Sequence, residues 1–317
     1  MNKSDLQVQP PVVELSHLTR RYARQEGLTD VSLQIPEGAV FGLVGENGAG
    51  KTTLIKHLLG LLKPQSGFVR VFGMDPAAEP VKVLSRIGFY SEESNLPGWM
   101  TVAEHIQVQR AFFPNWDPDY AELLRDEFDL DNSAKIKTIS RGSRAKLGLL
   151  TALAHRPQLL ILDEPSSGLD PLARRGILEA IIRSIADEGR TVLFSSHLMD
   201  EIERVADSVG MLANGKLVLC DKLDAVKESH YRLQVRFDSV PETSPNLKSS
   251  LCGAGDRAEW TFICSGNIID IRNQAREIGA TIQEESSLSL DEIFSARVAH
   301  AREGNREPHG EKWVAHE

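Results

Sequence analysis

Residues 40–53 read VFGLVGENGAGKTT, and this run settles the fold class. Its apolar start predicts a buried strand, and apolar residues at helical spacing from Thr53 to Leu62 predict a helix after it. Between them, Gly45 to Thr52 match the pattern GxxxxGK[ST]. Glycines let successive backbone N–H groups face phosphate oxygens, and the helix N-terminus adds partial positive charge. The run therefore predicts an α/β fold with a phosphate-binding loop.

The phosphate-binding loop also gives roles to its own side chains. Lys51 would place a full positive charge on the phosphates, and the Thr52 hydroxyl would bind Mg²⁺. A glycine-rich turn that merely caps a helix is the alternative, and the strand before it and the helix after it argue against that interpretation. The residues expected to hold the nucleotide are Gly45, Asn47, Gly48, Ala49, Gly50, Lys51, Thr52 and Thr53.

Two adjacent carboxylates follow a second apolar run, Gln158 to Leu162, which is typical of a strand buried in a parallel sheet. Because side chains alternate along a strand, Asp163 and Glu164 should point to different sides. One could then hold Mg²⁺ while the other faces an attacking water. Taken alone, two acids after a strand are better explained as a solvated turn. The phosphate-binding loop upstream favours Asp163 as a metal ligand and Glu164 as a catalytic base.

Composition limits the class of protein. The 317 residues are 41% hydrophobic and 26% charged, enough for a sizeable core, and the formal net charge of -9 argues against a binder of nucleic-acid phosphates. Three widely spaced cysteines suggest neither a disulfide framework nor a zinc site. No apolar run approaches the ~20 residues that span a bilayer, and the first residues lack a signal-peptide core. We therefore expect a cytoplasmic protein, which another chain must anchor if it works at a membrane.

The hydrophobic pattern changes along the chain and predicts two domains. The first is expected at residues 12–222, with an inserted helical subdomain at about 92–156. Alternation from Tyr231 to Phe237 opens a small α+β domain at 223–300, and residues 301–317 form a polar tail that includes Trp313. Further strands are expected at 12–18, 31–35, 191–195 and 259–264, and helices at 120–128, 144–154, 171–188, 198–206, 268–278 and 288–298.

A short segment before the Asp163 strand points to a family. Ile139-Ser140-Arg141-Gly142-Ser143 lies where ATPases of ABC transporters keep their LSGGQ signature, and the chain resembles that family here. Arg141 stands in place of a glycine and Ser143 in place of a glutamine. The resemblance implies that the segment opens a helix and that Ser140 and Gly142 contact the γ-phosphate of an ATP held by the opposite subunit. A lone Ser-x-Gly is also a routine helix start.

The remaining segments of that family follow in order. Ser167-Gly168-Leu169-Asp170 resembles the D-loop, which contacts the partner subunit, and His197 resembles the switch histidine that touches the γ-phosphate and supports the hydrolytic water. Tyr22 has the spacing of the aromatic residue that stacks on adenine, although packing on the core is nearly as good an explanation. Glu92 replaces the Q-loop glutamine. The resemblance gives Glu92 a contact with metal-bound water, but an ionised carboxylate cannot donate a hydrogen bond as an amide does.

The same resemblance suggests a docking surface. Residues Leu96 to Glu104 and the turn from Pro114 to Trp116 occupy the region that receives a short helix of the membrane subunit in this family. The aromatic side chains Trp99 and Trp116 would suit such a surface. Filling the core of the helical subdomain is an equal alternative.

The resemblance covers roughly residues 12–220. It implies an ABC cassette of the P-loop NTPase class, with a mixed sheet core, an antiparallel β subdomain and the helical insertion. It also implies ATP and Mg²⁺ as ligands, Lys51, Glu164 and His197 as catalytic residues, a second ATP-binding subunit in a homodimer, and an integral membrane permease that holds the protein at the inner face of the cell membrane. Ser289 to Phe294 resemble the C-terminal extension of bacterial export-type subunits, which favours export.

A soluble ABC-type ATPase that is not coupled to transport is the alternative function. Translation factors of that class carry two fused cassettes, whereas this chain has one GxxxxGK[ST] loop. DNA-repair ATPases insert long coiled coils between their nucleotide motifs, for which the interval from Lys51 to Asp163 is too short. A nucleotide kinase would explain these two residues but gives no role to Ser140, Asp170 or His197.

Overall fold

The computed structural model describes residues 10–22, 25–92 and 96–303, and the chain forms two compact units, Met1–Leu217 and Val218–Glu317. The boundaries predicted from sequence, 12–222 and 223–300, remain a prediction. Most of the predicted tail, including Trp313, lies outside the described residues.

A six-stranded sheet with the order β5-β6-β7-β3-β8-β9 forms the centre of the first unit. The neighbours from β5 through β8 pair in parallel. Every residue of β3, β6 and β7 is buried, as expected for central strands covered on both faces. The strands are β3 (Val40–Val44), β5 (Ile87–Ser91), β6 (Leu159–Asp163), β7 (Thr191–Ser196), β8 (Ser208–Ala213) and β9 (Lys216–Lys222).

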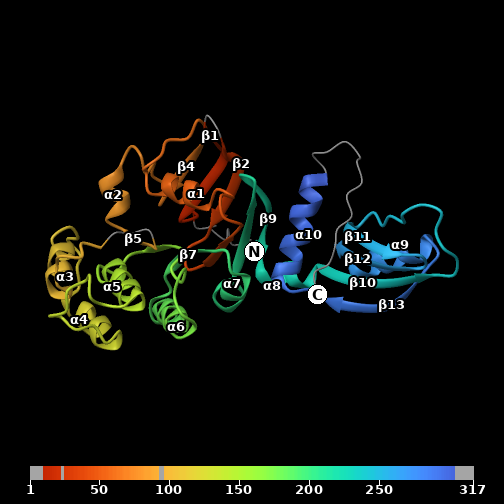
Figure 1. Cartoon of the computed structure of the whole chain (residues 1–317). Helices are drawn as coiled ribbons and strands as arrows, with labels where there is room; N and C mark the ends of the chain where they lie inside the picture. The colour runs from red at the N-terminus through yellow and green to blue at the C-terminus, as the bar shows by residue number, and fades with distance from the viewer. Residues whose placement is uncertain (1–9, 23–24, 93–95, 304–317) are drawn as a thin grey trace, which may run out of the picture. The chain divides into compact units, whose positions relative to one another are not determined.

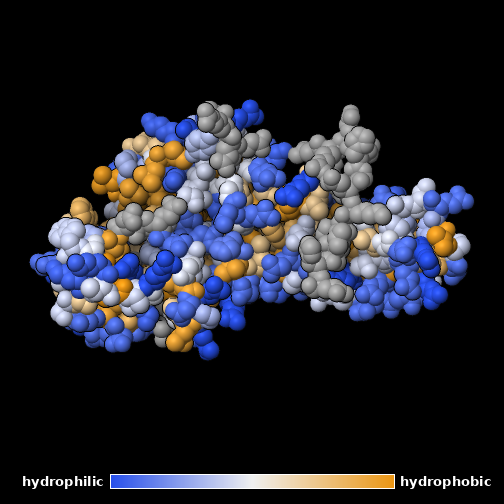
Figure 2. Space-filling view, viewed as in Figure 1, coloured by the Kyte–Doolittle hydropathy of each residue, from blue (hydrophilic) through white to orange (hydrophobic). Residues whose placement is uncertain are grey.

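An antiparallel sheet with the order β2-β1-β4 completes this core. Its strands are β1 (Val13–Tyr22), β2 (Gln25–Ile35) and β4 (Ser66–Val71), and inward-facing side chains such as Leu18 and Leu28 pack with those of α1 (Lys51–Leu58). The helix α1 begins within the phosphate-binding loop and is shorter than the predicted Thr53–Leu62, because the chain turns at Gly60 with φ +69°. Figure 2 shows hydrophobic surface over the region of α1, β4 and α2 (Pro80–Leu84), where Leu61, Phe68 and Val81 are exposed.

Helices α3 (Val102–Arg110), α4 (Pro118–Glu127) and α5 (Arg141–Leu153) form the group predicted between residues 92 and 156 (Figure 1). Each starts at a side chain that accepts a backbone N–H: Thr101 in a capping box, Asp117 before Pro118, and Ser140. These caps begin α4 and α5 two or three residues before the apolar pattern does.

Two more helices return the chain between central strands, namely α6 (Pro171–Glu188) and α7 (Met199–Val205), as predicted. Within the described ranges, no helix is both long and apolar enough to cross a membrane.

The second unit contains an antiparallel sheet with the order β11-β12-β10-β13. Leu233, Val235 and Phe237 point into its core, which confirms the alternation, and α9 contributes Ile271 and Ala275. Its elements are α8 (Leu223–Glu228), β10 (His230–Phe237), β11 (Ser250–Asp256), β12 (Glu259–Ser265), α9 (Ile268–Glu277), β13 (Ala280–Ser287) and α10 (Leu290–Glu303).

Candidate functional site

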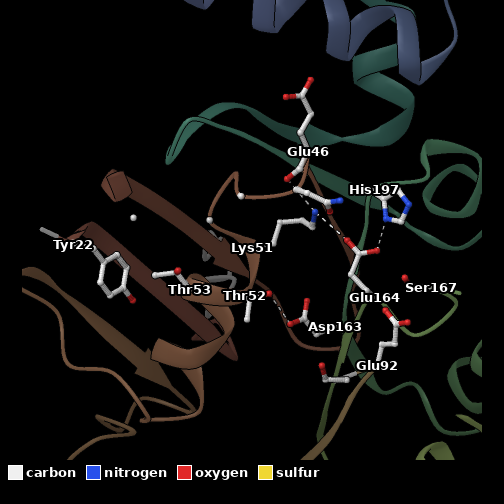
Figure 3. Close-up of a pocket in the computed structure, with 15 residues that line it drawn as sticks. Tyr22, Glu46, Lys51, Thr52, Thr53, Glu92, Asp163, Glu164, Ser167 and His197 are labelled. Carbon is white, nitrogen blue, oxygen red and sulfur yellow. Dashed lines mark hydrogen bonds and ion pairs between the residues drawn. The ribbon is translucent and has the colours of Figure 1, made fainter. Parts of the chain in front are cut away.

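A cavity of about 410 Å³ opens at the carboxyl ends of β3, β6 and β7 (Figure 3). In parallel sheets of this kind, ligands bind beyond the carboxyl ends of the strands. The cavity is lined by Tyr22, Gly27, Glu46, Asn47, Gly48, Gly50, Lys51, Thr52, Thr53, Ser91, Glu92, Asp163, Glu164, Ser167 and His197.

The loop between β3 and α1 has a backbone that only glycine permits at two points. Gly48 has φ +82° and Gly50 has φ +112°. A Cβ on Gly50 would lie 2.8 Å from the carbonyl oxygen of Gly27, so the two segments could not approach this closely with a larger residue. Two of the predicted nucleotide-binding residues, Gly45 and Ala49, are not among the described residues that line the cavity, and Ala49 is buried.

Lys51 is 5% exposed, and its ammonium group points into the cavity. Its Nζ donates to the carbonyl oxygen of Gly45 at 2.5 Å and lies 3.0 Å from Glu164 Oε1. Because both partners are buried or nearly so, the two charges interact strongly. The carboxylate and the phosphate-binding lysine therefore meet on one side of the cavity, as Figure 3 shows.

Thr52 and Asp163 form a second pair, on the floor of the cavity. The Thr52 hydroxyl donates to Asp163 Oδ2 at 3.0 Å, and the Ser195 hydroxyl donates to Asp163 Oδ1 at 2.6 Å. Hydroxyl and carboxylate oxygens are suitable ligands for Mg²⁺, which is usually held by one or two carboxylates together with substrate phosphates. Among the described residues, no cluster of three or more His, Cys, Asp or Glu side chains could hold a metal ion.

Glu164 follows the last residue of β6 and has φ +52°, a left-handed conformation that is uncommon for a residue with a side chain. This turn directs Glu164 away from Asp163. The prediction that the two carboxylates diverge therefore agrees with the structure, but alternation along a strand was the wrong reason. Glu164 Oε2 accepts a hydrogen bond from His197 Nδ1 at 2.6 Å, which places the Nδ1 proton between them.

Tyr22 stands at the end of the cavity opposite Glu164 and His197 (Figure 3). Its side chain is 43% exposed, so it does not fill the core, and the Arg20 guanidinium lies 5.4 Å from the centre of its ring. Glu92 is exposed on the side of Asp163, and its backbone N–H donates to the Asp163 carbonyl oxygen at 3.3 Å.

Glu92 and Arg141, which both depart from the family pattern, lie near the same glycine. A Cβ on Gly168 would meet Glu92 Oε1 at 3.0 Å and Arg141 Nη1 at 3.4 Å, and Gly168 itself has φ +67°. Glu92, in place of a glutamine, and Arg141, in place of a glycine, thus bring opposite charges close to Gly168, in the segment that resembles the D-loop.

Ser140 and Gly142 do not line the cavity, as far as the described residues show. Ser140 caps α5 by accepting the Ser143 N–H at 3.0 Å, and a Cβ on Gly142 would lie 2.9 Å from Ala173 Cβ in α6. The structure therefore brings together the predicted residues from the phosphate-binding loop, from β1 and from the ends of β5, β6 and β7, whereas Ser140 and Gly142 are not among the described residues of this lining.

Sequence reasoning missed Ser195, which orients Asp163. The sequence does give one indication of it: Ser195 is a hydroxyl residue in the apolar strand that begins at Thr191, and a buried polar group there must have a hydrogen-bond partner. Its partner lies 32 residues away, so the sequence alone does not name it.

Comparisons with known proteins agree with this geometry. Residues 28–167 match the family described as ABC transporter. The daunorubicin/doxorubicin resistance ATP-binding protein DrrA of Streptomyces peucetius is 31% identical over 93% of this chain and 83% of its own length. The bacitracin transport ATP-binding protein BcrA of Bacillus licheniformis is 33% identical over 65% of this chain and 68% of its own.

A solved structure of the ATP-binding subunit of an ABC transporter superposes with a TM-score of 0.62, at 31% identity, over 68% of this chain and 92% of that one. The phosphate-binding loop follows the buried parallel strand β3, and the two carboxylates lie at the end of β6 in the same sheet. This arrangement and the degree of relatedness agree with each other. The chain belongs to the ABC transporter family and is an ATP-binding, ATP-hydrolysing subunit of that family.

Proposed function

We propose that two copies of this chain bind MgATP between them and hydrolyse it to drive export through a separate membrane-spanning partner. The observation that carries this proposal is the convergence of Lys51, Glu164 and His197 on one side of the cavity, with ion-pair and hydrogen-bond distances of 3.0 and 2.6 Å. Charge neutralisation and the positioning of a water are the two tasks that phosphoryl transfer to water requires.

Each of these side chains has a defined role in the proposal. Lys51 and the backbone N–H groups after Gly48 bind the phosphates, and Tyr22 offers its ring to the adenine. Glu164 orients the attacking water, while His197 holds the carboxylate by its Nδ1 proton. Thr52 and Asp163 would hold Mg²⁺, with Glu92 contributing through a water; the ion neutralises charge on the phosphates.

A second copy would complete the site. Ser140 and Gly142 lie at the start of α5 and outside the cavity of their own chain. A serine hydroxyl and free backbone N–H groups at a helix start are suited to an anion brought to them by another molecule. We assign Ser140 and Gly142 to the γ-phosphate held by the partner copy, and Ser167 to Asp170 to the contact between copies.

A groove of about 290 Å³ beside α3 and α5 is the proposed place for a helix of the membrane partner. Its lining includes the apolar residues Phe89, Pro97 and Met100. Trp99, close to this groove in sequence, is 68% exposed. Trp116 is half-buried and lines a different cavity, so of the two tryptophans Trp99 is the one that we assign to docking. This partner would hold the protein at the inner face of the cell membrane. The names of two relatives, a bacitracin transport protein and a drug resistance protein, support export.

The decisive variant is Glu164→Gln, which keeps the shape of the side chain and removes its charge. We expect the dissociation constant for MgATP to stay within ~3-fold of wild type and the hydrolysis rate to fall at least ~100-fold, as for loss of a catalytic base. Light scattering should show a dimer with MgATP. Glu179→Gln, which alters an exposed glutamate paired with Arg175, is the matched control and should hydrolyse ATP normally. Wild-type turnover in Glu164→Gln would overturn these roles.

The membrane partner requires a separate experiment. Tagged Glu164→Gln protein is purified from detergent-solubilised membranes with MgATP, and the proteins bound to it are identified by mass spectrometry. Recovery of a polytopic membrane protein supports coupling to transport. Recovery from the soluble fraction only, alone or with ribosomes or DNA-repair proteins, would show instead an ABC-type ATPase that is not coupled to transport.

A further inference from the structure

Glu201, the third residue of α7, is a fully buried carboxylate with 0% exposed surface. The Ser166 hydroxyl lies 2.7 Å from both of its oxygens, and the Ser196 hydroxyl donates to Oε2 at 2.8 Å. Both serines are themselves 1% exposed. One carboxylate therefore joins two hydroxyl groups that are 30 residues apart in the sequence.

Burying such a charge is costly unless it is paired and hydrogen-bonded. Arg174 in α6 supplies an opposite charge, with its Nε 3.4 Å from Glu201 Oε1. The group also connects four segments: the turn after β6, the end of β7, and helices α6 and α7. A neutral residue could fill this space without the cost of burying a charge, so the acid needs an explanation beyond packing.

The two serines stand beside residues of the ATP site. Ser166 lies two residues after Glu164 and next to Ser167, which lines the cavity. Ser196 immediately precedes His197, and its hydroxyl also accepts the Leu198 N–H at 3.0 Å. The hydroxyl of Ser196 therefore links the residues before and after the histidine. A displacement of either serine would be passed to the other through the shared carboxylate.

We propose that Glu201 is a positioning residue, which holds the turn after β6 and the turn after β7 in one arrangement and thereby sets the contact between Glu164 and His197. That contact joins Glu164 Oε2 to His197 Nδ1, across the same two turns. Glu201 does not touch the nucleotide; it acts through Ser166 and Ser196. This inference rests on the roles proposed for Glu164 and His197.

The test compares Ser166→Ala, Ser196→Ala and the double variant, each of which removes hydroxyls but leaves the carboxylate in place. We expect each single change to lower kcat ~10-fold or more, because small displacements of catalytic groups are expensive. MgATP affinity should stay within ~2-fold of wild type, since Lys51 is untouched. The double variant should lose no more than the worse single variant, because breaking either arm already uncouples the turns. Ser196→Thr, which restores a hydroxyl, should recover most of kcat.

Ser265→Ala is the matched control, since Ser265 also ends a strand and accepts a hydrogen bond from a half-buried arginine, Arg297, but in the second unit. It should leave kcat unchanged. The inference would be overturned if the losses of kcat in the two single variants add up in the double variant and parallel the decrease in Tm. Wild-type kcat in both single variants would also overturn it. If Glu164→Gln also keeps full turnover, the proposed roles fail; if it abolishes turnover while these variants do not, only the role of Glu201 fails.

Discussion

Among the described residues that line the cavity, Tyr22 is the one with a phenyl, phenol or indole ring, and this ring is accessible from solvent. Stacking of a base on an aromatic ring contributes ~1–3 kcal/mol, so Tyr22→Ala should raise the dissociation constant for ATP ~5-fold or more. Tyr22→Phe keeps the ring and should bind ATP as wild type does. Titration with a fluorescent ATP analogue measures both variants. Equal affinity of all three proteins would mean that Tyr22 does not contact the base.

At this scale, the sequence predicts those site residues whose position follows from their own segment. Lys51 and Thr52 start a helix after the buried strand β3, and Asp163 ends β6, with β7 between these two strands. Local pattern and parallel pairing through β7 therefore bring them to the same edge of the sheet. Ser195 has its partner Asp163 32 residues away, and Glu201 has its partner Ser166 35 residues away, so nothing local names these partners. The backbone of Glu164 is a similar case, since its left-handed conformation is imposed by its surroundings.

Among the helices, two glycines have opposite environments. Gly148 in α5 faces Tyr90 of β5, and a Cβ there would lie 2.4 Å from the tyrosine ring. Gly176 in α6 has nothing within 4 Å of the same position. Gly148→Ala should therefore destabilise the fold by ~1–3 kcal/mol through overpacking, whereas Gly176→Ala should stabilise it by ~0.5–1 kcal/mol through helix propensity. Urea denaturation of both variants tests this, and a change of the same sign in both would refute the assignment of α5 packing on β5.

The boundaries of elements illustrate what periodicity can and cannot predict. Apolar spacing found α4 and α5, but their starts depend on the polar caps Asp117 and Ser140, which carry no hydrophobic signal. Strand β4 escaped prediction because only two of its six residues are buried, so its alternation is weak. Its place is fixed by pairing with β1, a contact made across about fifty residues of chain.

Across the whole molecule, buried histidines link stability to pH. Burial lowers the pKa of His57 and His155 in the first unit and of His230 in the second. An unfolded chain takes up these protons near pH ~6.5, while the folded chain resists them, so stability is full above that pH and is lost as pH falls through the lowered pKa values. The free energy of unfolding should therefore decrease between pH ~7.5 and ~5.5, above the range in which carboxylates titrate.

His155→Phe isolates one contribution to this effect. Phenylalanine keeps the stack on Phe113, whose ring lies 3.9 Å from that of His155, and loses only the hydrogen bond to the Ile87 carbonyl. The variant should lose less stability on acidification than wild type does. Urea titrations at the two pH values measure the difference, and an identical decrease would exclude His155 as a source.

Ser140 and Gly142 are not among the described residues that line the cavity of their own chain. In the proposed dimer, turnover would therefore depend on encounters between two copies. A site completed by another molecule has a rate per chain that rises with protein concentration and becomes constant only when all copies are paired. A membrane protein that holds two copies side by side replaces this encounter with a local concentration set by its own geometry, in the millimolar range for short tethers. Such a membrane protein would then determine when ATP is consumed, because it would control how often the two halves of each site meet.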